Sequence, residues 1–364
     1  MECIRLIITS RQEDFIRTSS SKEDLIKIRF GLGEWLGALG DLGTFVPILL
    51  SLAALNGLPL NRTLILAGIV YVSTALYFRL PMPVQPLKAM AAIAIAEGLS
   101  IPLLTSGGFW VGIILLLLYI TRRIDWLANY FTRPVVKGIQ LGVGLMLIKA
   151  STGLITMASY PQYSSGALVS GVFPSLTGFI SALWILVLPQ LPLTLGNAVF
   201  AASDVAHDYF GKKAKRVTPG NLALSLGLSN VAIGACGGLP VCHGSGGLTA
   251  HFRFGARTGG ATLILGCLFV GLGIGFKDLG DTILRSIPPW LLGLMLIYVG
   301  ACHAYLVRGL KEKRTLAVSM GIIGLITSNL AYSLALGLVV ENTSYIIYRI
   351  KAWRKVKVGS KDLR

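Results

Sequence analysis

The chain has 364 residues, of which 54% are apolar and only 13% charged, and its mean hydropathy is +0.71. Soluble domains carry about a quarter charged residues, and a chain of this size cannot bury so much apolar surface in one core. The apolar residues also form uncharged stretches, such as residues 316–332, long enough to cross hydrocarbon as a helix. The composition predicts an all-α protein that crosses the lipid bilayer many times. It excludes a soluble enzyme, a nucleic-acid-binding domain and a fibrous protein.

The formal net charge is +17, from 33 Lys and Arg against 16 Asp and Glu. Basic residues gather in clusters outside the apolar stretches, at residues 122–123, 212–216, 308–314 and 349–364. Because positively charged loops stay on the cytoplasmic side of a membrane, the charge indicates topology. We expect a multi-pass protein of the cell membrane with both termini in the cytoplasm. The five cysteines are scattered, so no disulfide framework, metal site or cofactor is expected.

In chain order, apolar length and loop charge predict spans at residues 30–55, 62–78, 83–98, 106–120, 134–156, 175–208, 219–236, 239–252, 258–276 and 287–306, and a region at 315–348 with room for two short spans. About twelve spans (10–12) place every strong basic cluster inside. The predicted organisation is a cytoplasmic N-terminal segment (1–29), a first membrane repeat (30–156), a non-cytoplasmic loop (157–174), a second, inverted repeat (175–348) and a basic cytoplasmic tail (349–364).

Two short motifs recur in the same order along the chain. Residues 42–46 (LGTFV) match residues 195–199 (LGNAV), and residues 82–86 (MPVQP) match residues 239–243 (LPVCH). The first motif precedes the second by a similar distance in both copies. In the predicted topology the two copies enter the membrane from opposite sides. This inverted repeat is typical of secondary transporters with a substrate site near the middle of the bilayer.

Prolines break the helix in both copies of the second motif. Pro83 and Pro86 favour an extended entry before a helix that begins near Leu87, and Pro240 with the glycines from Gly244 onward does the same in the second copy. Two helix N-termini would then meet within the membrane, each with free N–H groups and the positive end of a helix dipole. Such a pair predicts an anion-binding site.

Four blocks of sequence resemble the molybdate transporter family, a branch of the sulfate-permease superfamily. They are residues 40–44 (GDLGT), 81–89 (PMPVQPLKA), 189–198 (PQLPLTLGNA) and 238–247 (GLPVCHGSGG), the last continued by 253–260 (RFGARTGG). The resemblance runs from about residue 30 to 348. It implies the inverted-repeat fold shared by sulfate and uracil permeases, with a core and a gate domain and the substrate between the two broken helices.

The chain departs from that family between Lys149 and Pro189, where the family usually carries two further spans. Losing a pair of spans keeps the topology intact. The gate domain would then be incomplete, or completed by the second protomer of a homodimer.

Two charged residues stand inside predicted spans. An isolated carboxylate such as Asp41 costs a few kcal/mol within a membrane, so it is either a proton-coupling or gating group or a carboxylate bonded to backbone N–H groups of the broken helices. Lys88 lies in the first turn of a half-helix, where a cation opposes the helix dipole. We expect it to contact an anionic substrate or to pair with Asp41.

Neutral donors at the repeated motifs suit an oxyanion because they bind without the desolvation cost of a full charge pair. The expected substrate-binding residues are Thr44, Gln85, Lys88, Asn197, His243, Gly244 and Ser245. For each neutral polar residue alone, hydrogen bonding between helices is the simpler interpretation. His243 is also a candidate carrier of a coupled proton.

These observations predict a secondary transporter that takes up a tetrahedral oxyanion by alternating access, with the proton as candidate co-substrate. The anion class follows from the two helix N-termini and Lys88, whereas molybdate follows from the resemblance alone. A sulfate transporter or a transporter of several oxyanions would use the same kind of binding site, so both stay alternatives. A nucleobase permease of the same fold would want an acid in the second repeat, but the position matched to Thr44 is Asn197. No constellation of catalytic groups indicates an enzyme.

Overall fold

A computed structural model describes residues 26–157, 175–275, 286–341 and 343. Most of the predicted N-terminal segment (1–29), most of the predicted loop (157–174) and the predicted basic tail (349–364) lie outside the described residues. Within them, the chain is helical apart from short connections and two strands of two residues each.

The described part of the first half of the chain contains two long helices, a break, and four further helices, one of them short. They are α2 (Leu32–Asn56), α3 (Leu60–Phe78), β1 (Gln85–Pro86), α4 (Lys88–Glu97), α5 (Ile101–Ile120), the short α6 (Ile124–Ala128) and α7 (Arg133–Thr156). Each predicted span of this half has a helical counterpart, and the predicted third span (83–98) is an extended segment followed by α4.

The second half begins with a long helical rod, residues 176–214. It comprises α8 (Leu176–Ala182), α9 (Leu188–Leu193) and α10 (Ala201–Phe210), joined by π-helical turns at Leu183–Val187 and Thr194–Phe200 and closed by a 3₁₀ turn at Gly211–Ala214. Pro189 and Pro192 lie between the two π-helical turns. A proline lacks the backbone donor of a regular helix, and π-turns are a common accommodation of such a gap.

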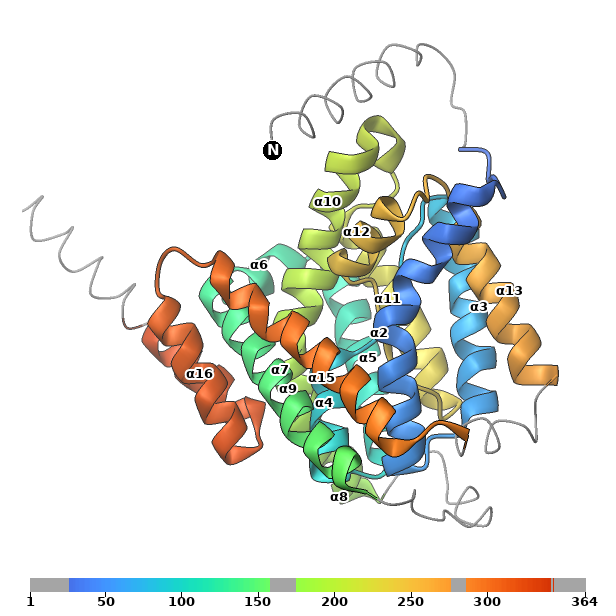
Figure 1. Ribbon diagram of the computed structural model, residues 1–364. Coiled ribbons are helices and arrows are strands. Elements are labelled where there is room, and N and C mark those ends of the chain that lie inside the picture. Colours follow the sequence, from blue (N-terminus) through green and yellow to red (C-terminus); the bar gives the residue numbers. More distant parts are fainter. Residues whose placement is uncertain (1–25, 158–174, 276–285, 342, 344–364) are drawn as a thin grey trace, which may run out of the picture.

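The remaining elements repeat the pattern of break and half-helix. They are α11 (Pro219–Ala235), β2 (Val241–Cys242), α12 (Ser245–Arg253), α13 (Gly260–Gly275), α15 (Pro289–Tyr305) and α16 (Arg314–Thr327), with a final helix at Leu330–Glu341. In Figure 1, α3 and α13 lie side by side at one edge of the molecule and α16 lies at the opposite edge beside α7.

Among the described residues, six helices are long and apolar enough to cross a membrane: α2, α3, α5, α7, the rod, and α15 extended to Gly309. Three shorter apolar helices, Gly260–Gly275, Arg314–Thr327 and Leu330–Glu341, add to them. The half-helices α4 and α12 have 10 and 9 residues, and at about 1.5 Å per residue neither crosses hydrocarbon alone. The total of about twelve spans stays a prediction.

Glycines allow close contacts between packed helices. In three pairs of packed helices, a Cβ added to one glycine would come within 2.5–3.3 Å of a backbone oxygen of the other. The pairs are Gly68 with Gly266 (α3 and α13), Gly112 with Gly227 (α5 and α11) and Gly144 with Gly300 (α7 and α15). In a bilayer no hydrophobic effect drives helices together, and small residues allow the close van der Waals packing that holds them in contact. The first two pairs hold the helices that flank α4 and α12 in the sequence.

Candidate functional site

The two repeated motifs meet in space. β1 and β2 pair antiparallel, with Gln85 opposite Cys242 and Pro86 opposite Val241, and the N–H of Leu87 donates to the carbonyl of Pro240 at 2.9 Å. Gln85 and Cys242 are also the residues that match when the two sequence motifs are aligned. Each strand leads directly into a half-helix, α4 at Lys88 and α12 at Ser245. Pro83, Pro86 and Pro240 therefore precede two helix starts held against one another.

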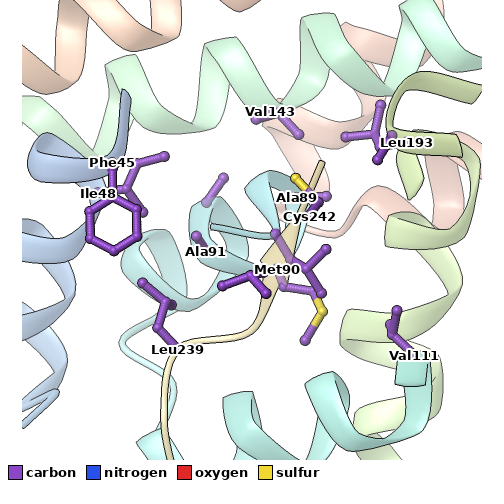
Figure 2. Packing of buried hydrophobic residues seen from close by; sticks show 14 of the residues in the cluster. Phe45, Ile48, Ala89, Met90, Ala91, Val111, Val143, Leu193, Leu239 and Cys242 are labelled. Atoms are coloured by element: carbon purple, nitrogen blue, oxygen red, sulfur yellow. The ribbon is translucent and has the colours of Figure 1, made fainter. Parts of the chain in front are cut away.

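Apolar side chains surround the start of α4. Ala89, Met90 and Ala91 are fully buried in a cluster that includes Phe45 and Leu193 (Figure 2). Water cannot satisfy backbone N–H groups in such surroundings, so a protein group must.

Gln190 on α9 satisfies two of these N–H groups. Its Oε1 accepts from the N–H of Ala89 at 2.9 Å and of Met90 at 3.3 Å, while its Nε2 donates to Thr194 Oγ1 at 3.1 Å. The expectation that α4 presents free donors is therefore wrong for these two groups, because a side-chain amide from the rod caps them. Gln190 is only 1% exposed.

The start of α12 is more open. The hydroxyl of Ser245 donates to Asn197 Oδ1 at 2.6 Å. A Cβ added to Gly244 would lie 3.0 Å from Gln85 Oε1, 3.2 Å from Lys88 Nζ and 3.4 Å from Asn197 Nδ2. Gly244 thus faces polar atoms from three different elements. Within the described parts of the chain, no acceptor is recorded for the backbone N–H groups of Ser245 and Gly246.

A cavity of about 10 Å³, room for about one water molecule, shares Lys88 and Asn197 with the surroundings of Gly244. The predicted residues Gln85, Gly244 and Ser245 are not among its lining residues. Its lining residues come from five elements: Lys88, Gln140, Gln190, Leu193, Asn197, Cys242 and His303. Gln140 Oε1 is buried without a hydrogen-bond partner. His303 Nδ1 lies 2.9 Å from the carbonyl oxygen of Val299, which can only accept, so the imidazole donates there.

Lys88 is the charged residue of this lining, and it is only 9% exposed. Its Nζ donates to the neutral Gln85 Oε1 at 2.7 Å. Among the described residues no carboxylate oxygen lies within 4.0 Å of Nζ. The expected alternative in which Lys88 pairs directly with Asp41 is therefore not what the structure has, because the amide of Gln85 stands between them.

Asp41 lies outside the cavity lining and is fully buried on α2. Its Oδ2 accepts from the hydroxyl of Tyr71 and from the N–H of Val84 at 3.1 Å, and its Oδ1 accepts from Gln85 Nε2. His251 Nε2 lies 3.5 Å from Oδ2. Asp41 is thus bonded to a backbone N–H of a broken helix, as one of the two interpretations expected, and reaches Lys88 through Gln85.

His243 and Thr44 lie away from the cavity. Both ring nitrogens of the buried His243 have partners: Nδ1 lies 2.8 Å from the carbonyl oxygen of Pro83, and Nε2 lies 3.0 Å from Ser225 Oγ. A neutral imidazole meets both contacts by donating at Nδ1 and accepting at Nε2. Thr44 is half-buried on α2 and is not among the lining residues.

Several residues of the site were not predicted from sequence, and four of them are Gln140, Gln190, His251 and His303. Gln190 lies within the block of residues 189–198 that resembles the family, so its position in that block could have indicated it as a site residue. The other three are single polar residues, two of them in long apolar helices, and nothing in their spacing distinguishes them from residues that join helices.

Asn230 on α11 fixes the extended segment of β2. Its Nδ2 donates to the carbonyls of Leu226 (2.9 Å) and Val241 (2.8 Å), and its Oδ1 accepts from the N–H of Val241 at 2.8 Å. Because Asn230 is fully buried, Asn230→Ala leaves both polar groups of Val241 without this partner and costs about 3 kcal/mol. We expect the midpoint of thermal unfolding to fall by about 5 °C or more.

The control for this variant is Asn221→Ala on the same helix. The side chain of Asn221 makes a single, part-buried bond, to the carbonyl of Arg216. A shift as large in Asn221→Ala as in Asn230→Ala would contradict the assigned role of Asn230.

A family model described as molybdate transporter of MFS superfamily matches residues 33–147 and 182–302. Molybdate transporter 2 of Arabidopsis thaliana is 28% identical over 363 residues, covering 73% of this chain and 77% of that protein. Molybdate transporter 1 of the same plant is 27% identical and covers 91% of both chains.

Solved structures show the same fold. The transmembrane domain of a cyanobacterial bicarbonate transporter, BicA, superposes with a TM-score of 0.59 at 14% identity, covering 86% of this chain and 98% of that one. SLC26A9 superposes with a TM-score of 0.57 at 14% identity, covering 87% and 65%. The fold is that of a multi-pass membrane transporter of the SLC26 and BicA type. Since the family model spans more than half of the chain, including both half-helices, this chain belongs to the molybdate transporter family.

Proposed function

We propose that the protein carries a tetrahedral oxyanion, most specifically molybdate, across the cell membrane by alternating access, and that the anion binds between α4 and α12. The observation that carries this proposal is Lys88, a buried cation whose nearest polar partner is a neutral amide. A buried charge without a counter-charge is costly. An anionic substrate would supply the missing charge.

The donors around the cavity suit an oxyanion. Donors from both copies of the repeat lie beside Gly244: Lys88 Nζ, Asn197 Nδ2 and the N–H groups of Ser245 and Gly246. No carboxylate lines the described cavity, so no ionised acid would lie directly against a bound dianion. One cation and several neutral donors can bind such an ion, and the protein then avoids the desolvation cost of a second buried cation.

The present cavity has room for about one water and must widen to admit an oxyanion. We infer that Gln190 moves away as the anion enters. Its Oε1 accepts from the N–H groups of Ala89 and Met90, as an oxygen of the anion would do, and its departure would free these two groups.

Alternating access would follow if α7 and α15, which carry Gln140 and His303, moved against the half-helices. The location of both termini in the cytoplasm, and a homodimer whose second protomer completes the gate, are part of the same proposal.

A binding titration tests the proposal. The purified full chain is titrated with molybdate, tungstate, sulfate and uracil, with thermal stability as the readout. Stabilisation by molybdate and tungstate at micromolar concentrations, with sulfate needing far more, supports a molybdate transporter. Equal stabilisation by sulfate would make it a general oxyanion transporter, and stabilisation by uracil alone would overturn the assignment of the substrate.

A further inference from the structure

His251 on α12 presents one ring nitrogen to a carboxylate. Its Nδ1 lies 2.8 Å from the carbonyl oxygen of Gly37 on α2. A carbonyl can only accept, so Nδ1 carries the hydrogen of this bond. The other nitrogen, Nε2, lies 3.5 Å from Asp41 Oδ2 and has no hydrogen-bond partner among the residues that the structure describes. Both side chains are fully buried.

The surroundings of Asp41 favour its ionised form. Three donors point at its two oxygens: the hydroxyl of Tyr71, the N–H of Val84 and the amide of Gln85. With His251 neutral and its hydrogen on Nδ1, the lone pair of Nε2 would face the carboxylate oxygen, so two acceptors would oppose each other. One proton on Nε2 replaces this repulsion by an ion pair.

No other charged group competes for this position within the described residues. On α2, the Glu34 carboxylate is held elsewhere, by the N–H groups of Thr258 and Ala261. Lys88 on α4 reaches Asp41 only through Gln85. The ionisable residues of α10 and the rest of α12 are directed elsewhere: Asp204, His207, Asp208 and Arg253 are exposed, as is Arg257 beyond α12, and Tyr209 stacks on Phe252.

We infer that Asp41 and His251 form the proton-binding site of the transport cycle. This inference rests on the proposed function and names the residues that couple proton uptake to anion transport. His251 Nε2 takes up one proton as the anion binds and returns it to water when the anion leaves on the other side. The proton comes from water on the side where the anion enters, so the N–H bond forms as an O–H bond breaks, and release reverses this exchange. His243 has partners at both ring nitrogens, whereas His251 Nε2 has none among the described residues, so His251 is the histidine with a free position for a proton.

A continuous set of contacts joins the proton site to the anion site. Asp41 is bonded to Gln85, and Gln85 is bonded to Lys88 at the cavity. With His251 neutral, Asp41, Lys88 and a bound dianion together carry a net double negative charge in the membrane, and the proton halves it. Protonation therefore favours anion binding, and by reciprocity the bound anion favours protonation.

The two sites also share one helix. Ser245, at the start of α12, and His251, in its last turn, are six residues apart, about 9 Å along the axis. The anion binds at the positive end of the α12 dipole, and a protonated His251 lies near its negative end. Each ligand thus stabilises the same charge distribution of one short helix.

Calorimetric titration of the full chain with molybdate between about pH 6 and pH 8, in buffers of different ionisation enthalpy, tests the inference. We expect uptake of about one proton per anion and an affinity that rises as pH falls, by up to about tenfold per pH unit. His251→Asn, which can keep a donor near the carbonyl of Gly37, should lose both the proton uptake and the pH dependence while still binding molybdate. Asp41→Asn should lose the pH dependence as well.

The matched control is His207→Gln on α10. His207 likewise has Nδ1 at 2.9 Å from a backbone carbonyl, that of Ser203, but it is exposed. This variant should behave as the unmodified protein. Molybdate binding without proton uptake, or a pH dependence that survives in a folded His251→Asn, would overturn the inference and leave the proposed function standing. Absence of oxyanion binding at every pH would instead overturn the proposed function.

Discussion

Lys88→Met is expected to weaken molybdate binding by about 30-fold or more. The substitution keeps the length of the side chain and removes its charge. A hydrogen bond to a charged group contributes about 1.5–3 kcal/mol, and in a buried site the loss of the single cation adds to this. The dissociation constant of the purified full chain, measured by calorimetric titration, gives the result directly.

Stability distinguishes this role from a structural one. Lys88 has no carboxylate within 4.0 Å in the described structure, so its replacement by methionine should leave thermal stability in the absence of anion unchanged or raised. Lys149→Met on α7 is the control, because Lys149 is exposed and its Nζ donates to Ser328 Oγ. An unchanged affinity in Lys88→Met, or a marked loss of stability, would place the anion elsewhere.

The half-helices could be located from the sequence because the residues directly before them determine where each helix begins. Proline fixes the backbone before each helix start, and α4 begins within one residue of the position expected. The match of residues 82–86 with 239–243 indicated that both breaks belong to one site, and the pairing of Gln85 with Cys242 is the physical form of that match.

The hydrogen-bond partners of the buried polar groups could not be predicted from local sequence. The N–H of Ala89 is bonded by Gln190, 101 residues away, and Asp41 meets His251 from the opposite repeat. Such contacts depend on how helices are packed and not on spacing along the chain. The sequence also presented Asp41 and Lys88 as a candidate ion pair, whereas the structure inserts Gln85 between them. An amide can donate to one and accept from the other, which is why it fits there.

Gly244→Ala is expected to abolish high-affinity molybdate binding while leaving the fold intact. Gly244 has φ −66° and ψ 132°, a backbone conformation that alanine adopts freely, so the cost is steric. The added methyl group would lie within 3.0–3.4 Å of Gln85 Oε1, Lys88 Nζ and Asn197 Nδ2. It would occupy the space into which these polar atoms point and bar an anion oxygen from it. Molybdate-dependent thermal stabilisation should disappear.

Gly246→Ala is the matched control, two residues further into the same half-helix. A Cβ there meets nothing within 4 Å, and alanine is the better helix former. Both variants remove a glycine from the first residues around the α12 start, so loss of binding in both would point to a need for backbone flexibility. Loss in Gly244→Ala alone ties the effect to the space beside Lys88. Normal binding in Gly244→Ala would mean that the oxyanion does not bind between the two half-helices.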